Sequence, residues 1–280
     1  KIFVTGHTGF QGSWLTLWLK SLGAKVTGYS LLPPTKPSLF EILQLKQDIN
    51  HIVGDVRDHS FLQKCLIKHK PDIVFHLAAQ PLVRLSYEKP VDTFHTNIMG
   101  TVNLLEAIRN TQSVKAGIII TSDKCYENKE WGFAYRENDP LGGFDPYSAS
   151  KGATEIVTSS YSRSFFHSNN KKRKIGIATV RAGNVIGGGD WAQDRIVPDC
   201  IRSIYSGKQI LIRNPKSIRP WQHVLEPISG MLLLASKLWD NPHSYNESWN
   251  FGPNLSTNVT VKELVIQIIK ELKSVVKDII

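Results

Sequence analysis

Tyr147 and Lys151 stand four residues apart in the stretch YSASK, at the start of a predicted helix. Residues with this spacing share one face of a helix, so the phenol and the ammonium are expected to converge. A phenol is a poor base at neutral pH, but a nearby positive charge favours the phenolate and lowers the pKa. The pair therefore predicts a base that takes the proton of an alcohol.

A glycine-rich turn lies at the other end of the chain, in the stretch TGHTGFQG. Gly6 permits a tight turn, Gly9 lets the backbone approach a pyrophosphate, and Gly12 lets helix and strand pack closely. The helix N-terminus that follows would face the phosphates. Because the turn sits between a predicted strand and a predicted helix, it indicates a dinucleotide site and places the chemistry at a nicotinamide, with Lys151 also holding the cofactor ribose.

His7 and Phe10 lie inside this turn and are expected to contact the cofactor. His7 either crowds the pyrophosphate or is a surface histidine. A carboxylate about 20 residues after the turn usually holds the adenosine ribose of NAD, but the second predicted strand ends at Ser30 and the next acidic residue is Glu41. No arginine stands there to hold a 2′-phosphate, so we predict NAD, bound more weakly than in proteins that have the carboxylate.

Further cofactor contacts are expected just after two other predicted strands, and they are Asp55, Val56, Leu77, Ala78 and Ala79. Asp55 is placed to touch the adenine, and a cap on the next helix explains it equally well. The small residues allow the cofactor to pass close to the backbone, with plain packing as the alternative. Asn97, which opens a predicted helix, is expected to order backbone or water near the site, to cap that helix, or to do both.

A hydroxyl, a carboxylate and an amine follow one another at Ser122, Asp123 and Lys124. They come directly after a predicted strand that ends at Thr121, which we expect to contact the cofactor. In such a sheet, ligands bind at the carboxyl ends of the strands. Asp123 alone would suit an ordinary turn, but two ionisable groups at this place, near Tyr147, indicate catalytic groups.

Apolar runs alternate with helical patterns, which predicts an α/β fold with a Rossmann-type, doubly wound parallel sheet. The predicted strands are 2–4, 25–30, 51–54, 72–77, 116–121 and 175–181, and the predicted helices are 12–22, 61–68, 97–109 and 147–166. We expect a dinucleotide-binding domain over 1–182, with 218–246 packing back onto it. Residues 183–217 and 247–280 are expected to form a smaller C-terminal substrate lobe, incomplete at its C-terminal end.

Composition excludes several other classes of protein. The chain has 280 residues, is 41% hydrophobic and carries a formal charge of +10. The run Lys171–Lys174 supplies four of those charges, and a solvated loop explains it better than a nucleic-acid site. Three scattered cysteines and nine unpaired histidines predict no disulfide framework and no metal. No run is long enough to span a membrane, and the chain opens without a signal-peptide pattern, so a cytoplasmic protein is expected.

From Ile2 to about Asn254 the chain resembles the extended short-chain dehydrogenase/reductases, and among them the nucleotide-sugar 4,6-dehydratases. The stretches that carry the resemblance are TGHTGFQGSWL, HLAAQPLVRLSY, TSDKCYENKEW, DPYSASK, RAGNVIGGGDWA, DRIVP and RPWQHV. It implies that Tyr147, helped by Ser122, deprotonates the 4-hydroxyl while hydride leaves carbon 4 for NAD. Asp123 then protonates the leaving 6-hydroxyl and Lys124, where the group usually has Glu, takes the carbon-5 proton, before hydride returns to carbon 6. A lysine in this role must be neutral, and burial beside a cationic ring favours the neutral amine.

The resemblance also implies a nucleotide-sugar substrate, with CDP-glucose favoured. Its expected contacts are Gln80 to the hexose, Asn184, Arg195, Ile196, Val197, Arg213 and Arg219. Arginines suit a diphosphate because their donors bind oxygen pairs, although a lone arginine is more often a solvated surface residue. A homodimer pairing the predicted helices 97–109 and 147–166 is implied as well. A nucleotide-sugar 4-epimerase, which needs neither Asp123 nor Lys124, and a non-catalytic NAD-binding regulator remain alternatives.

Overall fold

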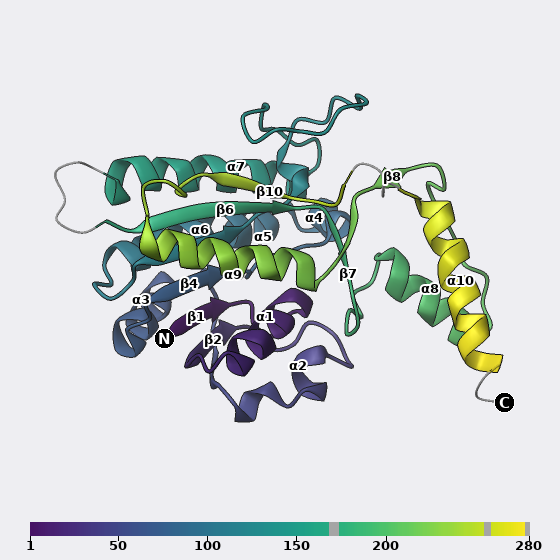
Figure 1. Ribbon diagram of the computed structural model, residues 1–280, viewed down its shortest axis with the longest axis horizontal. Helices are drawn as coiled ribbons and strands as arrows, with labels where there is room; N and C mark the ends of the chain where they lie inside the picture. Colours follow the sequence, from purple (N-terminus) through teal and green to yellow (C-terminus); the bar gives the residue numbers. More distant parts are fainter. Residues whose placement is uncertain (168–173, 255–258, 278–280) are drawn as a thin grey trace.

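The computed structural model describes residues 1–167, 174–254 and 259–277, and its centre is a parallel sheet of seven strands in the order β10-β6-β5-β4-β1-β2-β3 (Figure 1). The strands are β1 (Ile2–Thr5), β2 (Val26–Ser30), β3 (Asn50–Val53), β4 (Ile73–His76), β5 (Ala116–Ile120), β6 (Gly176–Ala182) and β10 (Ser248–Phe251). From β1 the chain adds β2 and β3 on one side, then returns to the other side of β1 and adds β4, β5 and β6 there. The direction of strand addition therefore reverses at β1. The predicted doubly wound sheet is confirmed.

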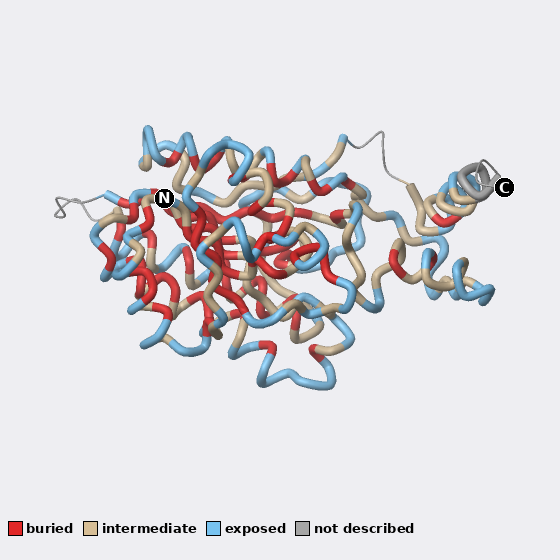
Figure 2. Tube along the Cα trace, turned by 90° about the horizontal axis from the view of Figure 1, so that it is seen from below, coloured by how far each residue is buried: buried red, intermediate tan, exposed pale blue. Residues whose placement is uncertain are grey.

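Helices cover both faces of the sheet, because successive side chains of each strand point to opposite sides. Val4 packs on the face that also buries Leu15 and Ile228, and Phe3 packs on the face that buries Leu104. The first face is covered by α1 (Phe10–Ser21) and α9 (Leu225–Asp240), and the second by α3 (His59–His69), α6 (Gly100–Arg109) and α7 (Pro146–Tyr161). Figure 2 shows the buried residues gathered in the sheet and on the inner faces of these helices.

Helix α7 begins at a well-defined point because its first residues favour a helix start. Asp145 is its N-cap, and the carboxylate accepts a hydrogen bond of 2.9 Å from the backbone amide of Ser148. Pro146 occupies the first helical position, where its missing N–H costs nothing. Tyr147 is therefore held in the first turn, at the end of the helix that meets the carboxyl edge of the sheet.

The helix that was expected to begin at Asn97 begins earlier. Helix α5 (Pro90–Phe94) runs through a π-turn, η2 (His95–Met99), into α6 without leaving helical backbone angles. Asn97 therefore lies in the middle of a continuous helical segment, and its interpretation as an N-cap is wrong. Proline at the first position of α5 explains the earlier start.

Beyond β6 the chain forms a small outer lobe that projects from one end of the sheet (Figure 1). Its helices α8 (Ile196–Tyr205) and α10 (Val261–Lys277) pack together, and β8 (Ile218–Arg219) pairs with β11 (Val259–Thr260). A second short pair joins β7 (Asn184–Ile186) to β9 (Trp221–His223). The short elements elsewhere are α2 (Leu39–Ile42), η1 (Leu45–Gln47), α4 (Val83–Glu88), η3 (Asp123–Cys125) and η4 (Ser162–Phe166).

Two parts of the expected lobe boundary differ from the structure. Residues 248–251, which were assigned to the lobe, are β10 and pair with β6 in the main sheet. Residues 218–219, which were expected to pack back on the first domain, pair with the lobe strand β11. Both pairings join segments far apart in sequence, which local patterns do not encode. Of the predicted basic loop, Lys171–Arg173 lie outside the described residues.

Within the described part of the chain, no helix is both long and apolar enough to cross a bilayer. The described residues also contain no cluster of three His, Cys, Asp or Glu side chains placed to hold a metal ion. Cys65, Cys125 and Cys200 are buried free thiols.

Two buried histidines stay neutral in the folded protein. Burial lowers the pKa of His76 to about 3, and the charge of Lys151 acts in the same direction. Burial, together with the neighbouring His51, lowers the pKa of His7 to about 3. Histidines in an unfolded chain titrate near 6.5, so below that pH the unfolded chain binds protons that the folded protein excludes.

We therefore expect the free energy of unfolding to fall as the pH drops from 6.5 toward about 3, by up to about 1.4 kcal/mol per pH unit for each of these histidines. Chemical unfolding followed at several pH values measures this slope. His76→Gln removes one titrating group and should make the slope shallower in that window. An identical slope in the variant would show that His76 does not account for it.

Candidate active site

The predicted site residues gather at the carboxyl edge of the sheet. The glycine turn follows β1, η3 follows β5, and the first turn of α7 meets η3 at the same edge. This is the edge at which parallel α/β sheets bind ligands, near the strand where the order reverses. Three stretches that are far apart in the sequence thus meet at one edge of the sheet.

The glycine turn has the geometry of a phosphate cradle. Gly6 has a φ of 74°, and a Cβ there would lie 2.6 Å from the backbone nitrogen of Ala78. A Cβ at Gly12 would collide with the carbonyl oxygen of Gly6. Helix α1 has Gly9 as its N-cap, and no described side chain caps it. Its first amides and its dipole therefore fit a pyrophosphate, and Phe10 stands half-buried at the first helical position.

His7 points away from the mouth of this turn. Its ring is fully buried, its Nε2 lies 2.7 Å from Nδ1 of His51, and Phe40 packs edge-on against it. The ring occupies the space above Gly28, where a Cβ would overlap it. The interpretation as a surface histidine is therefore wrong, and only the backbone of His7 can face the phosphates.

The end of β2 carries no carboxylate in the structure either. The Ser30 hydroxyl lies 2.8 Å from the hydroxyl of Thr8, which also donates to the carbonyl of Leu31 at 3.0 Å. Hydroxyls therefore stand where the ribose carboxylate was sought, and they can offer the ribose only neutral hydrogen bonds. The expectation of weak cofactor binding keeps its structural basis.

Asp55 forms a salt bridge with Arg57. Its carboxylate accepts hydrogen bonds from the Arg57 backbone and side chain at 2.9 and 2.6 Å. Although burial raises the pKa of Asp55, the bonds and charge of Arg57 outweigh it and lower the pKa. The helix-cap interpretation is wrong, because Asp58 caps α3 by accepting from Phe61. The Val56 side chain is buried in the core, so only its backbone can reach a ligand.

The end of β4 presents half-buried Leu77, Ala78 and Ala79 beside the turn. Beneath them His76 lies between two hydroxyls, 2.7 Å from Oγ1 of Thr5 and 3.1 Å from Oγ1 of Thr101. This buried chain ties β1, β4 and α6 together below the expected cofactor path. The small side chains leave the backbone of Ala78 close to Gly6.

Asn97 orders the backbone at the site, as one of its two interpretations expected. Its side-chain oxygen accepts from the Gln80 amide at 2.8 Å, and its nitrogen donates to the Gln80 carbonyl at 3.1 Å and to Ser150 at 2.8 Å. Gln80 uses its own side chain on the carbonyl and amide of Leu82 and on Thr93. The structure thus gives Gln80 a turn-holding role, and its contact with a hexose stays a prediction.

Ser122, Asp123 and Lys124 form the start of η3 at the end of β5. The Ser122 hydroxyl donates to the Asp123 carboxylate at 2.9 Å and accepts from the Lys124 backbone amide at 3.2 Å. Asp123 and Lys124 are half-buried, and the burial of the lysine beside a bound nicotinamide stays a prediction. Thr121, just before them, is buried and points its hydroxyl at Glu155.

Tyr147 is 9% exposed and lies beside these residues. Burial raises its pKa to about 12, although a hydrogen bond with Ser122 and the charge of Arg195 act to lower it. The expected lowering of its pKa depends on the bound nicotinamide as well as on Lys151, so it stays a prediction; in the protein alone, burial and the charge of Asp123 keep the pKa of Tyr147 high. Any shift toward phenolate must come from positive charge added when ligands bind.

Lys151 lies on the same face of α7, with its Nζ 6.0 Å from the centre of the Tyr147 ring. It donates to the carbonyl of Ile120 at 3.2 Å. Burial lowers the pKa of Lys151 to about 8, while Glu155 acts to raise it. The ammonium is thus held at the end of β5, between the sheet and the phenol, as the four-residue spacing predicts.

Arg195 is the predicted substrate residue nearest the chemistry. It forms an ion pair with the largely buried Asp190 at 3.1 Å. Its positive charge also acts to lower the pKa of Tyr147. Ile196 and Val197 follow in the first turn of α8 and are half-buried. Asn184 opens β7, opposite Trp221 of β9. These residues belong to the part of the chain that follows β6, and their contact with a substrate stays a prediction.

The other two arginines lie farther out. Arg213 is exposed and pairs with Asp194 at 3.2 Å, while Arg84 of α4 binds the same carboxylate oxygen at 2.9 Å. Asp194 thereby links the lobe to the first domain. Arg219 donates to the carbonyl of Ile218 in β8. The structure does not bring Arg213 and Arg219 to Tyr147, and their contact with a diphosphate stays a prediction.

Two buried charged residues were missed by sequence reasoning. Glu155 and Arg181 form a salt bridge of 2.8 Å, with side chains 2% and 3% exposed. Two signals were present: Glu155 lies four residues after Lys151, and Arg181 ends an otherwise apolar strand. A charge in such a strand indicates a buried partner.

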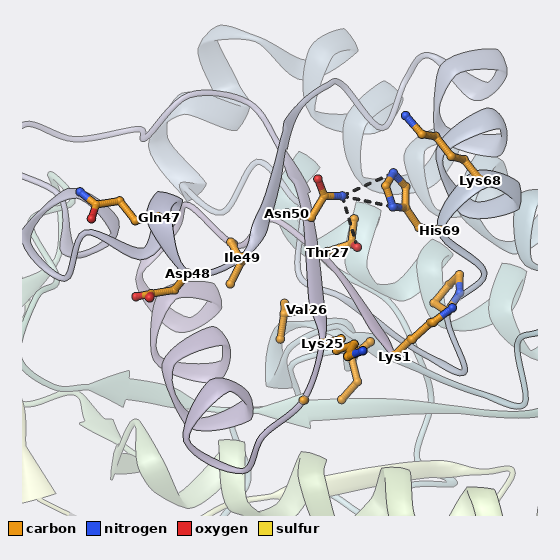
Figure 3. A pocket seen from close by; sticks show the side chains of 13 residues that line it. Lys1, Lys25, Val26, Thr27, Gln47, Asp48, Ile49, Asn50, Lys68 and His69 are labelled. Atoms are coloured by element: carbon orange, nitrogen blue, oxygen red, sulfur yellow. Dashed lines mark hydrogen bonds between the residues drawn. The ribbon is translucent and has the colours of Figure 1, made fainter.

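The molecule also has an open depression of about 600 Å³, but at the opposite edge of the sheet (Figure 3). It lies at the amino ends of β1, β2 and β3 and is lined by Lys25, Thr27 and Asn50, among others. Asn50 donates toward Thr27 and the ring of His69 within it. None of the predicted site residues borders this depression.

Comparison with known proteins agrees with this geometry. Residues 2–252 match the family described as "NAD dependent epimerase/dehydratase family". The CDP-glucose 4,6-dehydratase of Salmonella typhimurium is 55% identical over 266 residues, covering 95% of this chain and 74% of the relative. The dTDP-D-glucose 4,6-dehydratase of Homo sapiens is 27% identical over 98% of this chain and 75% of its own length.

Solved structures of similar fold include the dTDP-glucose 4,6-dehydratase DesIV from Streptomyces venezuelae, with a TM-score of 0.82 and 22% identity over 97% of this chain and 81% of that one. The UDP-glucose 4-epimerase of Thermotoga maritima has a TM-score of 0.82 and 23% identity over 96% of this chain and 81% of that one. At such identities these likenesses establish the fold alone.

Proposed function

The chain belongs to the NAD dependent epimerase/dehydratase family, and from that premise we propose that it dehydrates a nucleotide-diphosphate hexose to the 4-keto-6-deoxy sugar. The observation that carries the proposal is the meeting of Ser122, Asp123 and Lys124 with Tyr147 at the carboxyl edge of the sheet. A base for the 4-hydroxyl alone would serve an epimerase. An additional acid and amine beside it supply what elimination of water requires.

The glycine turn and the amides at the start of α1 would hold the pyrophosphate of NAD, and the missing side chains of Gly6 and Gly12 let the turn pack against Ala78 and against itself. Lys151, at the end of β5, holds the ribose near the nicotinamide. When bound, NAD would supply the hydride acceptor for carbon 4 of the sugar and the hydride donor for carbon 6. Its positive ring also favours the phenolate of Tyr147, against the burial that raises the pKa of this group to about 12.

The protein's own groups move the protons. Tyr147, hydrogen-bonded to Ser122, takes the 4-hydroxyl proton as carbon 4 is oxidised to a ketone. The ketone acidifies the carbon-5 hydrogen, and the neutral amine of Lys124 removes that proton. Asp123, as the acid, gives its proton to the 6-hydroxyl while the bond from carbon 6 to oxygen breaks and water leaves. The double bond between carbons 5 and 6 then accepts the returning hydride at carbon 6, and carbon 5 takes back the proton that Lys124 had removed.

The proposed substrate is CDP-glucose. The 55% identity to the Salmonella CDP-glucose 4,6-dehydratase spans nearly the whole chain and supports this choice over dTDP-glucose, whose dehydratases are more distant. Arg195, released from Asp190, is the arginine placed to meet the diphosphate closest to Tyr147. We further propose a cytoplasmic enzyme, consistent with its three buried free thiols.

The test of this function is incubation of the protein and NAD separately with CDP-, dTDP-, GDP- and UDP-glucose, read by mass spectrometry. Loss of one water from CDP-glucose, at a rate well above the other three, is the expected result. A mass-neutral isomer would instead indicate an epimerase. Good NAD binding with no reaction on any nucleotide sugar would indicate a non-catalytic regulator.

We propose a homodimer as well, formed through the outer faces of α5, α6 and α7. These faces expose large apolar side chains, among them Val91 at 77% and Ile156 at 61%. Exposed apolar area of this kind favours association. Light scattering after gel filtration tests the proposal, and a monomer at micromolar concentration would contradict it.

NAD affinity depends on the missing ribose carboxylate, and this gives a further prediction. Ser30→Asp places a carboxylate at the end of β2, where it can accept from the ribose hydroxyls. One charge-assisted hydrogen bond should lower the Kd for NAD about tenfold, measured by calorimetry. Ser21→Asp, which adds the same charge at the exposed end of α1, is the control and should leave Kd unchanged. Equal Kd values for the wild type and Ser30→Asp would contradict the prediction.

A further inference from the structure

We propose that the buried ion pair of Glu155 and Arg181 positions the segment that carries the acid and the amine of the reaction. The two side chains are 2% and 3% exposed and 2.8 Å apart. They come from different elements, because Glu155 is on α7 and Arg181 is on β6. The inference rests on the proposed dehydratase function and names residues beyond those that touch the substrate.

Glu155 holds the first end of the segment. One carboxylate oxygen, Oε1, accepts a hydrogen bond from the hydroxyl of Thr121. The other, Oε2, accepts from Thr179 at 2.7 Å, from Ser248 at 3.0 Å and from Arg181. Thr121 immediately precedes the catalytic segment, so its hydroxyl ties the beginning of that segment to α7.

Arg181 holds the second end. Its Nη1 donates to the hydroxyl of Tyr126 at 2.7 Å and to the carbonyl of Glu137 at 2.8 Å. Its guanidinium also stacks over the Tyr126 ring, 4.9 Å from the ring centre. The Tyr126 hydroxyl donates in turn to Asn250 of β10 at 2.7 Å. Tyr126 immediately follows η3, so it fixes the end of the segment.

The ion pair therefore grips residues 121 and 126, and the three proposed catalytic side chains, Ser122, Asp123 and Lys124, lie between them. Asp123 and Lys124 are themselves half-buried, and the short helix η3 that carries them packs against α7. Misplacement of a reacting group by about 1 Å can cost about 100-fold in rate. Anchors at both ends hold the backbone from which Ser122, Asp123 and Lys124 project, and so fix the positions of their side chains.

Stability alone does not explain the pair. Replacing a buried ion pair by neutral residues of similar volume is often neutral or stabilising, whereas removing one partner leaves a buried charge and is strongly destabilising. A test must therefore neutralise both residues together. Glu155→Gln with Arg181→Met does so, because the amide can still accept from Thr179 and Ser248.

The readout is the rate of each half of the reaction, measured in single turnovers with CDP-glucose and NAD. Absorbance of the reduced nicotinamide follows oxidation at carbon 4, which depends on Tyr147 and Lys151 of α7. Quenched-flow mass spectrometry follows loss of water, which depends on Asp123 and Lys124. In the double variant we expect elimination to slow about 100-fold. Oxidation should slow less, because the variant reaches it only through Ser122 and through the loss of the Glu155 charge near Lys151, so the reduced cofactor builds up.

Tyr126→Phe gives a gentler version that keeps the ion pair and removes the Tyr126 hydroxyl, with its hydrogen bonds to Arg181 and to Asn250. It should slow elimination selectively, by a smaller factor, and it keeps the proposal testable if the double variant fails to fold. Ser248→Ala is the matched control, because Ser248 donates to the same Glu155 oxygen but touches no part of the segment. Its two rates should match those of the wild type.

Equal slowing of both half-reactions in Tyr126→Phe, or a lower melting temperature with unchanged rates, would overturn the positioning role and leave the dehydratase function intact. Selective slowing by Ser248→Ala as large as that by Tyr126→Phe would overturn it too. A wild type that oxidises and dehydrates no nucleotide sugar would instead overturn the proposed function, and this inference with it.

Discussion

Tyr147→Phe should lower kcat for dehydration by about 10³-fold, with KM changed by less than about threefold. The phenol is the group that takes the 4-hydroxyl proton, and it is held beside Ser122 in the first turn of α7. Phenylalanine keeps the ring and its packing but cannot accept a proton. The loss therefore falls on the chemical step and not on binding.

The measurement is steady-state kinetics with CDP-glucose, together with the absorbance of reduced nicotinamide in a single turnover. No reduced cofactor should form, because oxidation is the first step. Tyr161→Phe, at the far end of the same helix, is the matched control and should behave as the wild type. A Tyr147→Phe variant with a normal rate of cofactor reduction would show that another group is the base.

Asp123→Asn should let oxidation at carbon 4 proceed but block the next step, the elimination of water. Asparagine still accepts the hydrogen bond that Ser122 gives to this side chain, but it cannot protonate the leaving hydroxyl. Loss of an acid of this kind typically costs about 10²- to 10⁴-fold. We expect oxidation at carbon 4 to proceed, so that reduced cofactor accumulates in proportion to the enzyme while no water is lost.

A rapid-scan absorbance measurement and mass spectrometry of the quenched sugar distinguish these outcomes. Lys124→Met should give the same arrest, since it removes the amine that takes the carbon-5 proton. Asp139→Asn, in the connection between η3 and α7, makes the same chemical change away from the site and should react normally. Unimpaired loss of water by both Asp123→Asn and Lys124→Met would remove the basis for a dehydratase mechanism at this site.

The local parts of the site could be predicted from the sequence. The glycine turn, the four-residue spacing of Tyr147 and Lys151, and the run from Ser122 to Lys124 are each short stretches whose position on a helix or strand end follows from neighbouring residues. The predicted family and the doubly wound sheet are confirmed by the 55% identical relative and by the strand order. The separate roles of the site residues stay predictions.

Long-range pairings could not be read in the same way. The His7 ring turns toward His51, 44 residues away, so its burial depends on β3 lying beside β2. Glu155 meets Arg181 only because α7 packs across β6. Asn97 sits in a π-turn inside a longer helical segment, and hydrophobic periodicity does not encode that feature. Strand β10 joins the sheet through its pairing with β6, across the outer lobe.

The outer lobe shows why the substrate contacts are the least determined part of the site. Arg195 is paired with Asp190, and Arg213 shares Asp194 with Arg84. A diphosphate must compete with these carboxylates for the guanidinium groups. Because Arg84 and Arg213 are largely exposed, solvent screens their ion pairs with Asp194, and these pairs contribute little to stability.

The central claim is an internal transfer, in which hydride leaves carbon 4 and returns to carbon 6 with loss of water between. CDP-glucose carrying deuterium at carbon 4 tests it most directly, with the product examined by NMR. We predict that the product is a 4-keto-6-deoxy sugar with deuterium at carbon 6, and that the cofactor is oxidised at the end of the reaction, as at the start. Deuterium retained at carbon 4 of a mass-neutral isomer, or left on the reduced cofactor, would contradict it.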